Sequence, residues 1–170
     1  MNSNGNVSVS EQNEEIIQNK HNDYDSKEEK IMPLVTSKEM LLKAQKGGYA
    51  VGAFNAENME MVKAIIQAAE ELKAPVMIQT TPSTVKYGTV ETYAAIVAAE
   101  AAKASVPVCL HLDHGSYDGC LKCVEAGFSS IMFDGSHYPI DENVAKTKEL
   151  VKIVAEHNMS LEAEVGSIGG

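Results

Sequence analysis

The segment VPVCLHLDHG places two histidines and an aspartate within four residues at the end of an apolar run. On an extended strand over 106–113, His111 and Asp113 share one face and two leucines share the other, because side chains alternate. An aspartate next to a histidine suits an acid/base group beside a metal ion, which would make substrate oxygens more acidic. We therefore take Asp113 as a candidate catalytic residue, His114 as a candidate metal ligand and His111 as a hydrogen-bonded supporting residue.

These residues also have structural alternatives. Asp113 could cap the next helix, although Ser116 and Asp118 already suit that position. His114 alone would be a weak metal site, because metal sites need several ligands. The metal interpretation therefore depends on further polar residues nearby.

Polar residues follow the other predicted strands as well. Asn55 and Asp134 each come directly after an apolar run, and Thr81 begins a hydroxyl-rich turn that could bind an anion or simply form the turn. Glu162 and Glu164 have the same parity on one strand, and the sequence leaves open which of them reaches the site. Since the carboxyl ends of parallel strands lie at one rim, these side chains are expected to converge there.

The elements that would position these residues alternate between strand and helix, which predicts an α/β fold with parallel strands. The βα period favours a (β/α)₈ TIM barrel of which this chain supplies about the first five units; a complete barrel needs roughly 100 further residues. A doubly wound sheet shares the rhythm, but its G-x-G-x-x-G fingerprint is absent. The predicted strands are 49–54, 75–80, 106–113, 129–135 and 160–166, and the main predicted helices are 57–74, 89–104, 117–126 and 141–157.

Two predictions concern single helices. The helix over 57–74 is expected to carry its apolar face on Met61, Ile65, Ala68, Ala69 and Leu72. Cys120 and Cys123 form a C-x-x-C, which could be a redox or zinc motif; we favour two thiols on one helix face, because no second cysteine pair completes a zinc site.

Composition limits location and partners. Residues 1–31 are acidic and poor in large apolar residues, so we expect a disordered N-terminal extension before a barrel portion over 32–170. The net charge of −10 argues against nucleic acid, and no apolar run is long enough to span a membrane. Three cysteines with no secretory signal favour the reducing cytoplasm.

Four motifs in order, YAVGAFNAEN, HLDHG, IMFDGSHYPIDENV and EAEVGSIGG, resemble the class II, metal-dependent ketose-bisphosphate aldolases from about Met32 to Gly170. The resemblance implies a zinc-dependent lyase (an aldehyde-lyase) of carbohydrate metabolism that forms homo-oligomers when full length. It implies reversible cleavage of fructose 1,6-bisphosphate, or tagatose 1,6-bisphosphate, to dihydroxyacetone phosphate and glyceraldehyde 3-phosphate.

The resemblance also implies residue roles. Asp113 matches the catalytic acid/base, and His114 matches a ligand of the catalytic zinc. Asp134 and Glu164 match carboxylates associated with a second divalent or monovalent cation. Thr81 matches a hydroxyl that binds a substrate phosphate. In the same way, Asn55 matches a substrate contact.

The family's two other zinc histidines and its phosphate loop would lie beyond Gly170. We therefore expect the chain as given to be an inactive fragment of the enzyme. The alternative is a non-catalytic truncated barrel, or an accessory subunit of a tagatose-bisphosphate aldolase complex. The choice between fructose and tagatose stays open.

Overall fold

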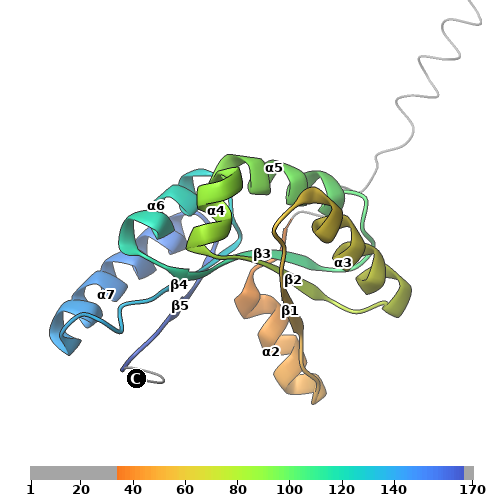
Figure 1. Cartoon of the computed structure of the whole chain (residues 1–170). Helices are drawn as coiled ribbons and strands as arrows, with labels where there is room; N and C mark the ends of the chain where they lie inside the picture. Colours follow the sequence, from red (N-terminus) through yellow and green to blue (C-terminus); the bar gives the residue numbers. More distant parts are fainter. Residues whose placement is uncertain (1–33, 167–170) are drawn as a thin grey trace, which may run out of the picture. The chain divides into compact units, whose positions relative to one another are not determined.

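The computed structural model describes residues 34–166, so the expected disorder of residues 1–31 lies outside the described part of the chain. Helices and strands alternate along it (Figure 1). Their order is α2 (Ser37–Gly47), β1 (Gly52–Asn55), α3 (Met59–Leu72), β2 (Val76–Thr80), α4 (Pro82–Gly88), α5 (Val90–Ala101), β3 (Val108–Gly115), α6 (Tyr117–Glu125), β4 (Ser130–Phe133), α7 (Ile140–Glu156) and β5 (Ser160–Ala163).

The strands form one parallel sheet in the order β1-β2-β3-β4-β5. A doubly wound sheet reverses its strand order at a switch point, whereas a barrel adds each strand next to the previous one. The sequential order therefore confirms the prediction of successive βα units of a (β/α)₈ barrel. Figure 1 shows α3, α5, α6 and α7 along one face of the curved sheet and α2 on the other.

The larger hydrophobic core lies between the sheet and the outer helices. Outward-facing strand residues such as Ile78, Leu110 and Ile131 are fully buried there. A smaller cluster on the inner face joins Met40 of α2 to Met77 and Cys109. Alternation along β2 and β3 thus divides apolar residues between the two faces, as expected for strands covered on both sides.

Local signals explain most helix boundaries. The Thr36 hydroxyl accepts a hydrogen bond from the Glu39 amide at 3.2 Å and begins α2. Gly48 ends that helix with φ 70°, a left-handed conformation that suits glycine. Ser116 begins α6 by accepting from the Gly119 amide at 3.2 Å, so it is Ser116, and not Asp113, that caps this helix.

The interpretation of the hydroxyl-rich segment that begins at Thr81 as a turn was wrong. Pro82 opens α4, and Thr81 and Thr84 form a reciprocal capping box at its start. Proline is favoured in the first turn of a helix, where no backbone amide hydrogen is needed. The sequence signal for a turn was therefore a helix start.

The predicted apolar face of α3 agrees with the buried face only in part, at Ala69 and the partly buried Ile65. The helix buries Val62, Ile66 and Ala69, whereas Met61 is 39% exposed and Leu72 is 77% exposed. Leu72 and its apolar neighbours Ile65 and Ala68 line an open groove of about 430 Å³ with Phe54 of β1. This groove lies at the edge of the sheet, where no described residues cover it.

Cys120 and Cys123 are completely buried on α6, and both thiols are free. This confirms that they share a helix face in the core. Within residues 34–166, no helix combines the length and apolarity needed to cross a membrane.

Candidate metal centre

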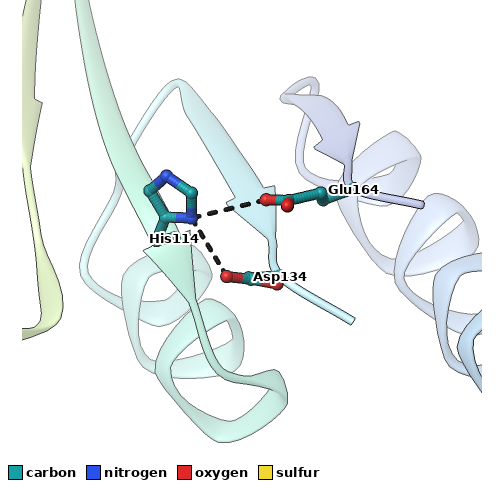
Figure 2. A group of neighbouring side chains, drawn as sticks. All are labelled: His114, Asp134 and Glu164. Atoms are coloured by element: carbon teal, nitrogen blue, oxygen red, sulfur yellow. Dashed lines mark hydrogen bonds and ion pairs between the residues drawn. The ribbon is translucent and has the colours of Figure 1, made fainter. Parts of the chain in front are cut away.

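Three side chains from the ends of β3, β4 and β5 meet in one cluster: His114, Asp134 and Glu164 (Figure 2). One ligand atom from each lies within 4.8 Å of the others. The Nδ1 atom of His114 lies 3.0 Å from Oδ2 of Asp134 and 3.5 Å from Oε2 of Glu164. One nitrogen and two carboxylate oxygens are thus close enough together to be ligands of one cation.

His114 reaches this cluster because the strand is irregular. Strict alternation would put His114 on the helix-covered face with Leu112. Instead, the β3–β4 register shifts between Leu112 and Gly115, and His114 has φ 51°. Such a bulge re-aims a side chain at the end of a strand. The expectation that His114 and Gly115 lie beyond the strand was wrong, because β3 continues to Gly115.

Gly115 is required by close packing at this point. A Cβ atom there would lie 2.9 Å from the carbonyl oxygen of Met132, which is backbone and cannot move aside easily. The Asp134 amide also donates to the Gly115 carbonyl at 2.9 Å. The irregular end of β3 is therefore held directly against the end of β4.

Asp134 is fixed as an ionised carboxylate. Its Oδ1 accepts hydrogen bonds from the Ser136 amide at 3.1 Å and from the Ser136 hydroxyl at 2.6 Å. The Ser136 hydroxyl bond, then the bond to His114 and then the Ser136 amide bond hold the pKa of Asp134 below its ordinary value. The other oxygen, Oδ2, stays directed at His114.

One buried oxygen of Glu164 accepts no hydrogen bond from the described residues. Its side chain is 11% exposed, against 61% for Glu162, so Glu164 is the residue of this pair that lies in the cluster. Its Oε2 is buried and has no hydrogen-bond partner among residues 34–166. The 3.5 Å approach to His114 is an ion-pair distance only, because Nδ1 bonds to Asp134 instead.

An unpaired buried carboxylate oxygen costs free energy, and a cation at this point would satisfy it. The donor set of imidazole nitrogen and carboxylate oxygens is one that zinc accepts. The hydrogen bond to Asp134 raises the pKa of His114, and the negative charges of three nearby carboxylates raise it further. Partial desolvation of the ring opposes this shift. The residues present therefore fit a divalent cation.

Asp113 lies next to the cluster and outside it. Its Oδ1 is 3.9 Å from Nε2 of His114, and its side chain is 23% exposed. A carboxylate that is solvent-accessible and adjacent to a cation site is free to exchange a proton with a bound molecule. The geometry is compatible with the acid/base role expected from the sequence.

The other predicted site residues lie apart from this cluster. Asn55 is exposed at the end of β1. The Thr81 hydroxyl contacts Ser83 at 2.7 Å and Thr84 at 2.9 Å, and it caps α4. No hydrogen bond or ion pair within residues 34–166 joins either residue to His114, and their substrate-binding roles stay predictions. His111 is buried behind the cluster and makes a hydrogen bond, which agrees with a supporting position.

Two supporting residues were missed from the sequence. Ser136 fixes Asp134, and Asn143 donates a hydrogen bond to the Glu164 carbonyl at 2.8 Å. The signal for Ser136 was a serine two residues after an aspartate in a turn. Asn143 could have been noticed as a polar residue on the buried face of α7, where it is 3% exposed.

Comparison with known proteins identifies the family. The sequence model of the protein family described as fructose-bisphosphate aldolase class-II matches residues 35–170 of this chain. Fructose-bisphosphate aldolase from Streptococcus pyogenes serotype M3 is 48% identical over 142 residues, which is 82% of this chain and 48% of that protein. Fructose-bisphosphate aldolase from Ureaplasma parvum is 47% identical over 143 residues, covering 82% of this chain and 49% of that protein.

Solved structures agree. The YdjI aldolase from Escherichia coli K12 matches with a TM-score of 0.73 and 34% identity, over 81% of this chain and 53% of that chain. Fructose-bisphosphate aldolase from Campylobacter jejuni shares the fold, with a TM-score of 0.71 at 23% identity, over 83% of this chain and 50% of that chain. The chain spans about half the length of these relatives. By its sequence match and its fold, this chain belongs to the class II fructose-bisphosphate aldolase family.

Proposed function

We propose that this chain supplies the acid/base residue and part of the cation site of a metal-dependent ketose-bisphosphate aldolase. The observation that carries the proposal is the buried Oε2 of Glu164, which lies beside His114 and Asp134 and has no hydrogen-bond partner among residues 34–166. The relatives named fructose-bisphosphate aldolase support fructose 1,6-bisphosphate as the first substrate to test, with tagatose 1,6-bisphosphate as the second.

The reaction needs a proton acceptor and a way to stabilise negative charge. Cleavage of the C3–C4 bond begins when the C4 hydroxyl loses its proton, and Asp113 would accept it. A bound zinc ion would supply electrostatic stabilisation of the charge that develops on the substrate oxygens. His114, Asp134 and Glu164 would hold that ion or a second cation, and Ser136 would keep Asp134 oriented through its two hydrogen bonds.

Substrate contacts are assigned by position. Asn55 is the last residue of β1, and Thr81 directly follows the neighbouring parallel strand β2. Both residues therefore lie at the same end of the sheet as the cluster. We propose a phosphate contact for Thr81 and a polar substrate contact for Asn55. In the complete enzyme, we propose a cytoplasmic homo-oligomer acting on phosphorylated sugars.

A chimera tests the activity. Residues 35–170 would be joined to the C-terminal remainder of the Streptococcus pyogenes relative, and cleavage of both sugar bisphosphates would be measured. We expect cleavage that is abolished by a chelator and restored by zinc. Replacing Asp113 with asparagine should lower kcat by roughly 100- to 10,000-fold, because the proton acceptor is lost. A folded chimera that cleaves neither sugar would contradict the proposal.

The 170-residue chain itself should be assayed beside the chimera. We expect it to bind zinc weakly and to lack cleavage activity. Full activity of the isolated chain would show that the fragment hypothesis is wrong. Zinc binding without activity in the chimera would favour the alternative, a non-catalytic barrel or accessory subunit.

A further inference from the structure

Beneath the cluster, three buried polar side chains on the inner face of β3, β4 and β5 are joined by hydrogen bonds to Ser37 of α2. Nδ1 of His111 lies 2.7 Å from Oγ of Ser130, which lies 2.8 Å from Oγ of Ser37. Oγ of Ser37 lies 2.7 Å from Oγ of Ser160. All four residues are at most 7% exposed. We call this set the serine–histidine chain.

The hydrogen bonds of this chain run in one direction. Ser130 donates its hydroxyl hydrogen to Ser37, so its oxygen can only accept from His111. Nδ1 of His111 is therefore assigned the proton. Burial lowers the pKa of His111 to about 4, which keeps the ring neutral near pH 7. Its role is that of a fixed neutral donor.

The same chain joins three strands to one helix. His111 is in register with Ser130, and Ser130 is in register with Ser160. Ser37 lies in the first turn of α2, and its amide donates to Ser160 at 3.0 Å. That amide is one of the helix-start donors that need a partner outside the helix. One helix start thus bonds directly to β4 and β5, and through β4 to β3.

The three strands joined here are those that end in His114, Asp134 and Glu164. Ser130 lies four residues before Asp134, and Ser160 lies four residues before Glu164. β4 and β5 are only four residues long, so few ladder bonds fix their register. A buried polar network that is fully paired specifies one arrangement of its members, whereas apolar contacts tolerate sliding.

We propose that the serine–histidine chain is a positioning device that fixes the relative register of β3, β4 and β5, and thereby keeps the three ligand atoms within reach of one cation. His111, Ser130, Ser37 and Ser160 are positioning residues that do not touch the cation. This inference rests on the cation site of the proposed function and adds the residues that set its affinity.

Matched variants of the 170-residue chain test it. His111→Leu removes the donor at similar size, whereas His111→Asn keeps an amide donor close to the position of Nδ1. Ser130→Ala breaks the same bond from the other side. We expect His111→Leu and Ser130→Ala to weaken zinc binding by about 10- to 100-fold, and His111→Asn to stay within about threefold of the parent, by titration calorimetry.

Leu110→Ala is the control for general destabilisation. Leu110 is the neighbour of His111 on the opposite, helix-covered face, so its truncation leaves a cavity without touching the serine–histidine chain. We expect Leu110→Ala to lower the free energy of unfolding at least as much as His111→Leu, with zinc affinity unchanged. Equal losses of affinity in both variants, or no rescue by His111→Asn, would overturn the proposal.

A second readout does not depend on metal. The amides of Asp134 and Glu164 donate to Gly115 and Phe133 across the strand ends. In metal-free protein, we expect these two amides to exchange hydrogen about 10-fold faster in His111→Leu than in Leu110→Ala of matched stability. If the parent binds no zinc but this difference appears, the cation site fails and the positioning role stands. Equal exchange rates of both amides in His111→Leu and Leu110→Ala would contradict the positioning role.

Discussion

His111 and His114 lie three residues apart on β3, yet the fold gives them opposite properties. His111 is 1% exposed and bonds to a serine hydroxyl, and burial lowers its pKa to about 4. The His114 side chain is 55% exposed, and its bond to Asp134 raises its pKa. Desolvation dominates at the first histidine and neighbouring carboxylates dominate at the second.

The difference shows that position along a strand decides what an imidazole can do. One layer below the rim, a neutral ring serves as a fixed hydrogen-bond donor. At the end of the strand, the imidazole of His114 lies among carboxylates, whose negative charge would stabilise a bound cation. The bulge between Leu112 and Gly115 separates these two environments, because it turns His114 away from the helix-covered face.

The largest expected effect is at the rim. Replacing His114 with alanine or Asp134 with asparagine should weaken zinc binding by more than about 100-fold, because each change removes a ligand rather than a supporting residue. Titration calorimetry at pH 7.5 would measure it. Glu162→Gln is the control, since Glu162 is exposed on the same strand as Glu164 but outside the cluster. Equal losses in Glu162→Gln would contradict the assignment.

The pH dependence of stability tests the buried histidine. The folded-state pKa of about 4 lies below the ordinary value of 6.5, so protonation favours the unfolded chain. The contribution of His111 is complete above pH 6.5 and is lost as pH falls from 6.5 toward 4. The loss is at most roughly 3 kcal/mol, from 1.36 kcal/mol per pKa unit.

Urea unfolding at pH 7 and pH 5 would measure this loss. The comparison is with His111→Asn, which keeps a donor but cannot titrate, whereas the neighbouring carboxylates Asp113 and Glu162 are present in both proteins. We expect a smaller loss of stability on acidification in the variant. Identical losses would show that His111 is not the titrating group.

A smaller effect is expected from Ser136→Ala. The variant loses the 2.6 Å hydroxyl bond to Asp134 but keeps the amide bond at 3.1 Å. We expect zinc affinity to fall by about 10-fold, with little change in the melting temperature, because the residue orients a ligand at the surface. Ser136→Thr keeps a hydroxyl and should retain most of the affinity. A loss of zinc affinity in both variants would indicate that the conformation of the turn matters and that the hydroxyl bond to Asp134 does not.

The smallest expected change is at the thiols. Burial raises the pKa of Cys109 to about 11 and those of Cys120 and Cys123 to about 12, so little thiolate exists at pH 8. We expect no reaction with a disulfide reagent in the native state, and three thiols to react after unfolding in urea. Rapid modification of Cys120 and Cys123 would instead support a redox or zinc-binding C-x-x-C.

Local patterns in the sequence determined the strand–helix alternation, the helix over 117–126 and the placement of Asp113 at the end of a strand. Each depends on neighbours within a few residues: alternation of two, a helical repeat, a cap. The paired thiols of α6 were predictable for the same reason, because residues three apart share a helix face. The parallel order of the sheet followed from the short connections between units.

Only the tertiary structure decided which of Glu162 and Glu164 is buried, which face of α3 packs inward and how His114 turns toward Asp134. The serine–histidine chain is the clearest case, since Ser37 bonds to partners 93 and 123 residues away. No periodicity links residues so far apart, and their meeting depends on strand register and on where α2 packs. Local sequence thus sets the elements, whereas the convergence of ligands and hydroxyls depends on long-range packing that neighbouring residues do not encode.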